Sequence, residues 1–235
     1  MKVRLALRRV HIWLGWVIGI PLLIWTASGL FMAAQPIETV RGEHLVNDVP
    51  TLALDAPPVP PLIGPRPVES LRLEQRPGGA RWVVRYADGG ARLADPATGR
   101  LLPALTAAEA AAAVRARYVG QARISAVDRT SAEAPPVELR RPIATWRVSF
   151  DDGTRFYVDA ATGEILARRT PLWRVYDLLW GLHILDLDTR DDFNNPWLVG
   201  LSAVSLVSIL MALILLPMTL RRRRRRPDGA ASRRR

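Results

Sequence analysis

Four side chains in this sequence could hold the iron of a haem group. They are His11, His44, His183 and Met32, and histidine and methionine are normal axial ligands of haem iron. A helix of 20 residues is about 30 Å long, so His11 and His183, at opposite ends of a membrane-spanning arrangement, are too far apart to share one haem within a chain. His183 with either His44 or Met32 is the pairing that the expected topology allows.

The competing interpretation treats each histidine as a polar residue at a membrane interface. Ionisable groups deep in a membrane are functional candidates, but His11 lies two residues after Arg9 and can reach the lipid headgroups. Both roles stay open for His11 and His183, whereas we expect His44 to be incidental. We predict no catalytic residue, because no nucleophile–base pair is evident, and the lack of cysteine excludes disulfides and thiolate metal sites.

An aromatic stripe precedes His183. Trp173, Tyr176 and Trp180 stand before it at three- and four-residue steps, which is one face of a helix. Such a helix beside a membrane span is expected to lie along the outer leaflet. The acidic residue Asp177 is expected to lie off this face.

Four aspartates follow in the same region of the chain, namely Asp186, Asp188, Asp191 and Asp192. Carboxylate oxygens can hold a hard cation, but the spacing is not that of an EF-hand. We therefore expect a solvent-exposed loop and predict no metal-ion site.

Two long apolar runs must position these residues. Residues 10–37 and 193–220 contain no Asp, Glu, Lys or Arg. About 20 apolar residues cross a bilayer as a helix, so we predict transmembrane helices over residues 10–34 and 196–219. The first contains the step Gly15-x-x-x-Gly19, which is compatible with close packing on the second helix or on another protomer.

The net charge of +11 lies at the two ends of the chain: residues 1–9 carry +4 and residues 220–235 carry +8, which leaves −1 between them. Basic segments beside a span stay in the cytoplasm, so both termini are predicted to be cytoplasmic. The Ala-, Arg- and Pro-rich composition suggests a bacterium, where this would be a two-pass inner-membrane protein with a periplasmic domain. A cleaved signal peptide is the alternative for the first run.

The arginine run at residues 221–226 could suggest nucleic-acid binding. Its place next to a predicted span instead favours a stop-transfer anchor and contact with anionic lipids. We therefore expect the lipid bilayer as a partner and no nucleic acid.

The region between the spans contains an internal repeat. Residues 82–102 and 146–166 align without a gap, and nine of the 21 positions are identical. Each copy has alternating apolar residues, an Asp-Gly pair typical of a tight hairpin, and then Asp-x-Ala-Thr-Gly. In that turn the Asp can accept backbone hydrogen bonds and the Gly can take a left-handed conformation. We predict one strand-rich unit used twice.

The two copies differ in what precedes them. Thr106 and Glu109 form a capping box at the start of an alanine-rich helix that Gly120 is expected to end, and a strand follows near residues 122–128. Before the first copy stand six prolines between residues 56 and 67, which predict an extended linker and no helix.

The same residues resemble a known family. Residues 146–166 resemble the PepSY domain, a helix packed on a small antiparallel sheet with an Asp/Thr/Gly turn. Residues 8–30 resemble the first helix of PepSY-associated transmembrane proteins, and residues 177–187 resemble the Leu-His element of that family. The family positions in the first helix are a basic pair, a His, a Gly and a final Ser-Gly, which here are Arg8, Arg9, His11, Gly15, Ser28 and Gly29.

The resemblance implies an α+β membrane protein in which two transmembrane helices flank an extracytoplasmic tandem of PepSY-like helix-plus-antiparallel-sheet units. The expected segments are a cytoplasmic basic tail (1–9), transmembrane helix 1 (10–34), a Pro-rich linker (35–67), PepSY-like unit 1 (68–104), PepSY-like unit 2 (105–170), an interfacial aromatic helix with an acidic loop (171–195), transmembrane helix 2 (196–219) and a cytoplasmic Arg-rich tail (220–235).

Known PepSY proteins include protease inhibitors and membrane proteins linked to iron uptake, among them haem-bearing ferric-siderophore reductases. The resemblance therefore implies three functions. The first is a non-enzymatic binding, regulatory or accessory component of an envelope process, in one form iron-linked, with a membrane or periplasmic protein partner or a second copy of the chain. The second is a haem-b electron-transfer component of ferric-siderophore reduction, although those reductases generally have four or more spans with several histidines. The third is a protease inhibitor.

Overall fold

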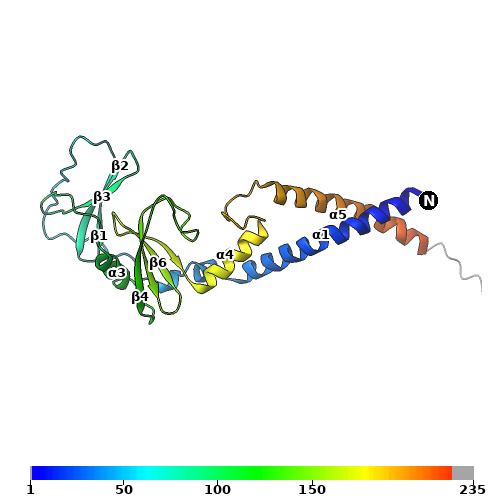
Figure 1. Ribbon diagram of the computed structural model, residues 1–235, viewed down its shortest axis with the longest axis horizontal. Coiled ribbons are helices and arrows are strands. Elements are labelled where there is room, and N and C mark those ends of the chain that lie inside the picture. Colours follow the sequence, from blue (N-terminus) through cyan, green and yellow to red (C-terminus); the bar gives the residue numbers. More distant parts are fainter. Residues whose placement is uncertain (1, 224–235) are drawn as a thin grey trace, which may run out of the picture. The chain divides into compact units, whose positions relative to one another are not determined.

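The computed structural model describes residues 2–223 (Figure 1) and divides into two compact units. One unit contains the residues up to 34 and those from 177 onward, and the other contains residues 35–176. The expected Arg-rich tail lies, from residue 224, outside the described residues. The elements are α1 (Lys2–Ala34), α2 (Ile37–Val40), η1 (Glu43–Leu45), β1 (Val68–Arg76), β2 (Gly79–Tyr86), β3 (Ala91–Ala94), α3 (Ala107–Arg115), β4 (Ile124–Thr130), β5 (Thr145–Phe150), β6 (Arg155–Asp159), β7 (Ile165–Arg169), α4 (Pro171–His183) and α5 (Pro196–Arg223).

The two apolar helices predicted from the sequence are present as α1 and α5, which lie side by side (Figure 1). Residues 4–34 and 196–217 are long and apolar enough to cross a bilayer. Most of their large apolar side chains are exposed, and Ile18 and Leu215 are exceptions that are buried. The helix α1 begins at Lys2, earlier than the predicted span, because residues 2–9 are mostly good helix formers with no Gly or Pro.

The start of α5 is fixed by a capping residue. The Asn195 side-chain oxygen accepts a hydrogen bond from the Leu198 N–H at 2.9 Å, and its amide donates to the Ile184 carbonyl at 2.8 Å. Asparagine is among the preferred N-cap residues, and Pro196 occupies the first helical position, where its missing N–H costs nothing.

The second unit contains two antiparallel sheets with strand orders β1-β2-β3 and β4-β5-β6-β7. The helix α3 packs on the second sheet, where Ala110 and Val114 contact a core that contains Val148, Phe150 and Phe156. Thr106 and Glu109 form both hydrogen bonds of the predicted capping box at its start. The class is therefore α+β with helices at both ends of the chain.

The two aligned stretches of sequence form hairpins with equivalent turns. The carboxylates of Asp95 and Asp159 each accept hydrogen bonds from the N–H groups two and three residues later, the first of them at 2.7 Å in both turns. Gly99 and Gly163 close these turns with φ angles of +71° and +70°, a region that favours glycine. The turn chemistry expected from the sequence is thus present in both copies.

The equivalence extends to the segments that precede the hairpins. The Trp82 indole donates to the Val59 carbonyl and the Trp146 indole donates to the Leu105 carbonyl, each at 2.8 Å. The N–H groups of Val59 and Leu105 in turn donate to the carbonyl of the residue after each turn aspartate, at 2.7 and 2.8 Å. Leu105 leads directly into α3, whereas two prolines follow Val59, so the structure has no helix between residues 46 and 67.

Two short helices lie within residues 35–67, the expected Pro-rich linker, before the stretch of residues 56–67 that was expected to be extended. These are α2 and η1, and Val40 at the end of α2 is buried. Gly42 follows it with a φ of +65°, and a Cβ there would lie 3.2 Å from the Thr170 side chain. The first part of this segment therefore packs beside Thr170, which follows β7. Residues 46–67 form the connection to β1.

Candidate functional site

His183, at the end of α4, packs against α1. Its Nδ1 atom lies 3.0 Å from the Ser28 hydroxyl oxygen and 3.0 Å from the Trp25 carbonyl oxygen. The imidazole stacks on the Trp25 ring, with centroids 4.6 Å apart and an angle of 16° between the planes. Two of the residues that the sequence singled out are therefore in direct contact.

Gly29 makes room for this contact. A Cβ atom at this position would lie 3.1 Å from the His183 Cε1 atom, closer than ordinary van der Waals contact. Ser28 thus forms a hydrogen bond with the imidazole, and Gly29 leaves the space that the ring occupies. The sequence marked both positions by resemblance alone, and Trp25 was missed because a tryptophan in an apolar helix carries no local signal of its partner.

The hydrogen bonds around His183 favour one tautomer. The Ser28 hydroxyl donates to the Trp25 carbonyl at 2.9 Å. If Nδ1 carries the proton, it can donate to both oxygen atoms, whereas an unprotonated Nδ1 would place its lone pair against the carbonyl oxygen. The Nε2 atom then keeps a lone pair, which can accept a proton or ligate a metal.

His11 makes a contact of the same kind at the other end of α1. Its Nδ1 atom lies 3.2 Å from the hydroxyl of Ser208, a buried residue of α5. His11 and Ser28 are 17 residues apart on one helix, which corresponds to about 25 Å along its axis. Within one chain His11 and His183 therefore cannot ligate the same iron.

The remaining two candidate ligands are placed differently. Met32 is half-buried in α1, four residues after Ser28 and thus on the same face of the helix. His44 is an exposed residue of η1 in the second unit. Among residues 2–223, no three His, Asp or Glu side chains gather into a metal-binding group.

Asp177, expected to lie off the aromatic stripe of α4, has a partner that the sequence did not indicate. Asp177 is buried, and its carboxylate pairs with Arg190 at 2.6 Å. Arg190 returns toward α4 because its backbone takes a φ of +59°, and its carbonyl accepts a hydrogen bond from the Trp180 indole at 3.0 Å. A Cβ atom at Gly181 would lie 2.8 Å from the carbonyl of residue 186, so this glycine permits the loop to approach the helix.

The acidic segment after α4 is a hydrogen-bonded loop built on Asp186. Its carboxylate accepts from the Thr189 hydroxyl at 2.6 Å and from the N–H groups of Thr189, Asp191 and Asp192 at 3.0 to 3.1 Å. These bonds, the Thr189 hydroxyl first, hold the pKa of Asp186 far below its usual range. Its carboxylate oxygens are occupied by the loop itself, and the other three aspartates are exposed.

A second carboxylate is held in the other unit by a network of cations. Glu138 accepts hydrogen bonds from Arg174 at 2.7 Å, from Arg155 at 3.0 Å and from the Tyr157 hydroxyl at 3.0 Å. Burial opposes its ionisation, but Arg174 and Arg155 outweigh burial and lower the pKa of Glu138. Burial and the Glu138 charge raise the pKa of Tyr157. The network joins the loop before β5 to β6 and to the first turn of α4, which is a structural role.

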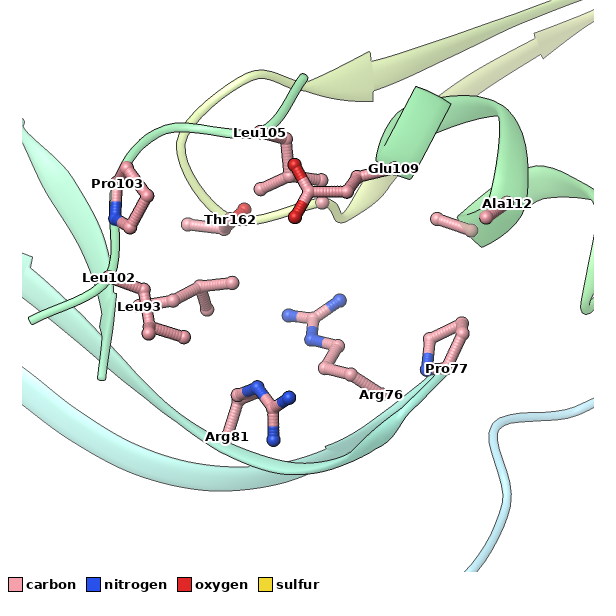
Figure 2. Close-up of a pocket in the computed structure, with 12 residues that line it drawn as sticks. Arg76, Pro77, Arg81, Leu93, Leu102, Pro103, Leu105, Glu109, Ala112 and Thr162 are labelled. Atoms are coloured by element: carbon pink, nitrogen blue, oxygen red, sulfur yellow. The ribbon is translucent and has the colours of Figure 1, made fainter. Parts of the chain in front are cut away.

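A cavity of about 300 Å³ lies between α3 and the first sheet (Figure 2). Arg76 and Arg81 reach into it from the β1–β2 hairpin, and Glu109 faces them from α3 (Figure 2). Its walls are mainly apolar and include Leu93 and Leu102. The cavity was not predicted from the sequence, because alternating charged residues in a strand usually indicate a solvent-exposed face.

Comparison with known proteins identifies the family of this chain. The model of the PepSY-associated TM region matches residues 8–235. No curated protein and no solved structure matches the chain. The match and the two apolar helices together fit a membrane protein. The matched range includes His11, Ser28 and His183. Because the match covers nearly the whole chain, the chain belongs to the family of the PepSY-associated transmembrane region.

Proposed function

We propose that this chain is a non-enzymatic protein of a bacterial inner membrane that holds a PepSY-like binding module in the periplasm. There it binds a ligand or protein partner as an accessory or regulatory component of an envelope process. The observation that carries the proposal is the cavity between α3 and the first sheet. The residues of the cavity lie in the sequence between the two apolar helices.

The proposed topology follows from charge. Along the sequence, the basic residues of both apolar helices stand at the end farther from residues 35–176, and basic segments remain in the cytoplasm. The proposal that residues 68–170 are two PepSY-like units is supported by the equivalent turn and indole hydrogen bonds of the two hairpins. In this interpretation the first PepSY-like unit, residues 68–104, lacks the helix of the second because prolines follow Val59.

Binding is favoured over catalysis by the way the acidic groups are used. Glu138 and Asp186 each accept short hydrogen bonds from arginine, hydroxyl or backbone donors, which lower the pKa of each. A carboxylate whose pKa is lowered by such donors is a poor proton acceptor near neutral pH. These groups therefore support the framework around a binding surface.

In-membrane photo-crosslinking tests this function. A photoreactive phenylalanine analogue is placed at Ala112, an exposed α3 residue that lines the cavity, and in a matched control at Ala87, an exposed residue of the β2–β3 turn outside the cavity lining. We expect a discrete adduct from position 112 and not from position 87. The same adduct from both positions, or none from position 112, would contradict the proposal.

A second candidate function is haem-b-linked electron transfer toward an iron substrate. It is favoured by the hydrogen bond of the His183 Nδ1 atom to a backbone carbonyl, which leaves Nε2 as a potential ligand, as is common for metal-bound histidines. One chain would supply one imidazole per iron, with Met32 or a second copy of the chain supplying the other ligand. A bound haem would provide a one-electron redox centre.

An absorption spectrum decides this second candidate. The chain is expressed with haem supplied, purified and compared with the variants His183→Ala and His44→Ala. A Soret band that is lost in the first variant and kept in the second supports haem binding. The absence of a Soret band in the unaltered chain eliminates it. The third candidate, a protease inhibitor, rests on the PepSY resemblance alone and ranks last.

A further inference from the structure

We infer that the cavity between α3 and the first sheet is a binding site for an amphipathic anion, namely a carboxylate attached to a short branched apolar group. The inference rests on the proposed function, in which residues 35–176 are the binding part of the protein, and names the chemical class of its ligand. Two sources can supply this chemistry: a free carboxylic acid, and the C-terminal end of a peptide with an apolar last residue.

The hairpin between β1 and β2 delivers two cations to one face. Arg76 is the last residue of β1 and Arg81 is the third of β2. Arg81 pairs in register with Glu74, which lies two residues before Arg76, so all three side chains share a sheet face. Both guanidinium groups enter the cavity (Figure 2).

Arg76 has donors that the fold does not use. A guanidinium carries five N–H donors. One nitrogen of Arg76 pairs with Glu74 at 2.7 Å, but the Nε atom is buried and has no hydrogen-bond partner within residues 2–223. Arg81 is held in place by bonds to the carbonyls of Ala80 and Gly78, at 2.7 and 3.3 Å. A carboxylate in the cavity would accept from the terminal nitrogen of Arg76 that does not pair with Glu74. The covered Nε atom can take part only if the side chain shifts.

The acidic residue of the cavity lining is already stabilised. Glu109 accepts hydrogen bonds from the N–H and the hydroxyl of Thr106, at 2.7 and 2.8 Å. The Thr106 N–H and then its hydroxyl lower the pKa of Glu109, and the N-terminus of α3 favours a negative charge at this position. Glu109 and Glu74, which pairs with Arg76 from outside the cavity lining, together balance the two guanidinium charges. The attraction for an anion therefore comes from the donors of Arg76 that neither glutamate occupies.

The apolar walls and the volume of the cavity determine the size and polarity of the part of the ligand attached to the carboxylate. Leu93, Leu102 and Leu105 form an apolar side opposite short alanine side chains of α3. A volume of about 300 Å³ is at the small end of ligand pockets, which suits a carboxylate with one branched side chain. A neighbouring cavity of about 190 Å³ shares Arg76 and continues toward residues 47–50, which leaves a path for the preceding residues of a peptide.

The test measures binding to the full-length chain in lipid nanodiscs by isothermal titration calorimetry. The probes are 4-methylpentanoate, acetyl-Ala-Ala-Leu with a free carboxylate, and the same peptide with a C-terminal amide. At least one carboxylate probe should bind, and the amide should bind about 10- to 100-fold more weakly than its acid. A tighter peptide acid identifies a peptide end as the source, and a tighter 4-methylpentanoate identifies a free acid.

Three variants localise the binding. Arg76→Gln should weaken the binding of the carboxylate probe about 10-fold or more. Arg72 is an exposed residue of the same sheet face outside the cavity lining, and Arg72→Gln should change the dissociation constant by less than about 2-fold. Ala112→Trp fills the cavity without altering any charge and should abolish binding, which keeps the test decisive if Arg76→Gln does not fold. Thermal unfolding of each variant checks the fold.

The inference is overturned if no probe binds, if acid and amide bind equally, if Arg76→Gln and Arg72→Gln have equal effects, or if Ala112→Trp binds like the unaltered chain. Its failure differs from failure of the proposed function. If no probe binds but position 112 still yields a specific adduct in membranes, the ligand class is wrong and the binding function stands. If residues 35–176 lie in the cytoplasm, the proposed function itself fails.

Discussion

Removal of the cation from the buried Asp177–Arg190 pair should strongly destabilise the unit that contains α1 and α5. The Asp177 side chain is 5% exposed and that of Arg190 is 23% exposed, and their charged atoms are 2.6 Å apart. Arg190→Met keeps an unbranched apolar side chain beside Gly181 but leaves a buried carboxylate without this cation. The expected loss is about 3–5 kcal/mol of unfolding free energy.

The opposite change should cost less. Asp177→Asn keeps the shape and a hydrogen-bond acceptor, and the partly exposed Arg190 can reach water, so the expected loss is about 1.5 kcal/mol. The double variant should lose about 1–3 kcal/mol less than the sum of the two single losses. The reason is that Arg190→Met leaves no buried charge behind once residue 177 is a neutral Asn.

Reversible unfolding by SDS in mixed micelles, followed by tryptophan fluorescence, measures these differences. Asp188→Asn, at an exposed loop position, is the matched control and should change little. If Asp177→Asn costs as much as Arg190→Met, or if the two losses simply add, the pair does not act as a buried charge with its partner.

Gly29→Val should lower the unfolding free energy by about 1–3 kcal/mol, because even a Cβ atom there would lie 3.1 Å from His183, whereas Gly15→Val has nothing within 4 Å and should be neutral in the same SDS titration; equal effects would argue against the packing described. Glu138→Gln should flatten the acid limb of stability. Because the pKa of Glu138 is lowered in the folded protein, its ionised form stabilises the fold above the ordinary pKa, and this stabilisation is lost as pH falls through the folded pKa. The melting temperature is measured from neutral pH to about pH 3. If it falls as steeply with pH in the variant as in the unaltered chain, this role of Glu138 is refuted. Asp159→Ala removes the acceptor of two turn N–H groups and should cost about 1 kcal/mol in thermal unfolding, and an unchanged midpoint would contradict it.

The features that the sequence predicts best depend on chemistry within a few residues. The capping box of Thr106 and the turns at Asp95 and Asp159 require partners only two or three residues away. The two apolar helices are equally local, since length and composition suffice. In each case the residue types within a few positions determine how the backbone N–H and C=O groups are hydrogen-bonded.

The candidate site was predictable only in part. Ser28 and His183 were both singled out, but their contact joins residues 155 positions apart, which no local pattern reveals. Glu138 lies in a proline-containing loop, and its cationic partners are 17 and 36 residues away. The Gly15–Gly19 step is open in the structure, with nothing within 4 Å of either Cβ position, so it does not pack on α5 and stays available to lipid or to another protomer.

The cavity was missed for a different reason. Arg76 ends a polar stretch of β1 and Arg81 lies between apolar residues of β2, as is common in half-exposed strands. Their common orientation depends on the register of the β1–β2 hairpin, and the space above them depends on α3, which lies between the two aligned stretches of sequence. Three segments must be placed before these residues become neighbours.

The side of the membrane on which residues 35–176 lie tests the central claim most directly. The chain has no cysteine, so Ala134→Cys, at an exposed loop position before β5, and Lys2→Cys each carry a single thiol. A membrane-impermeant maleimide added to bacterial spheroplasts should label Ala134→Cys at once and Lys2→Cys only after the membrane is opened. Protection of Ala134→Cys until lysis would contradict a periplasmic binding module.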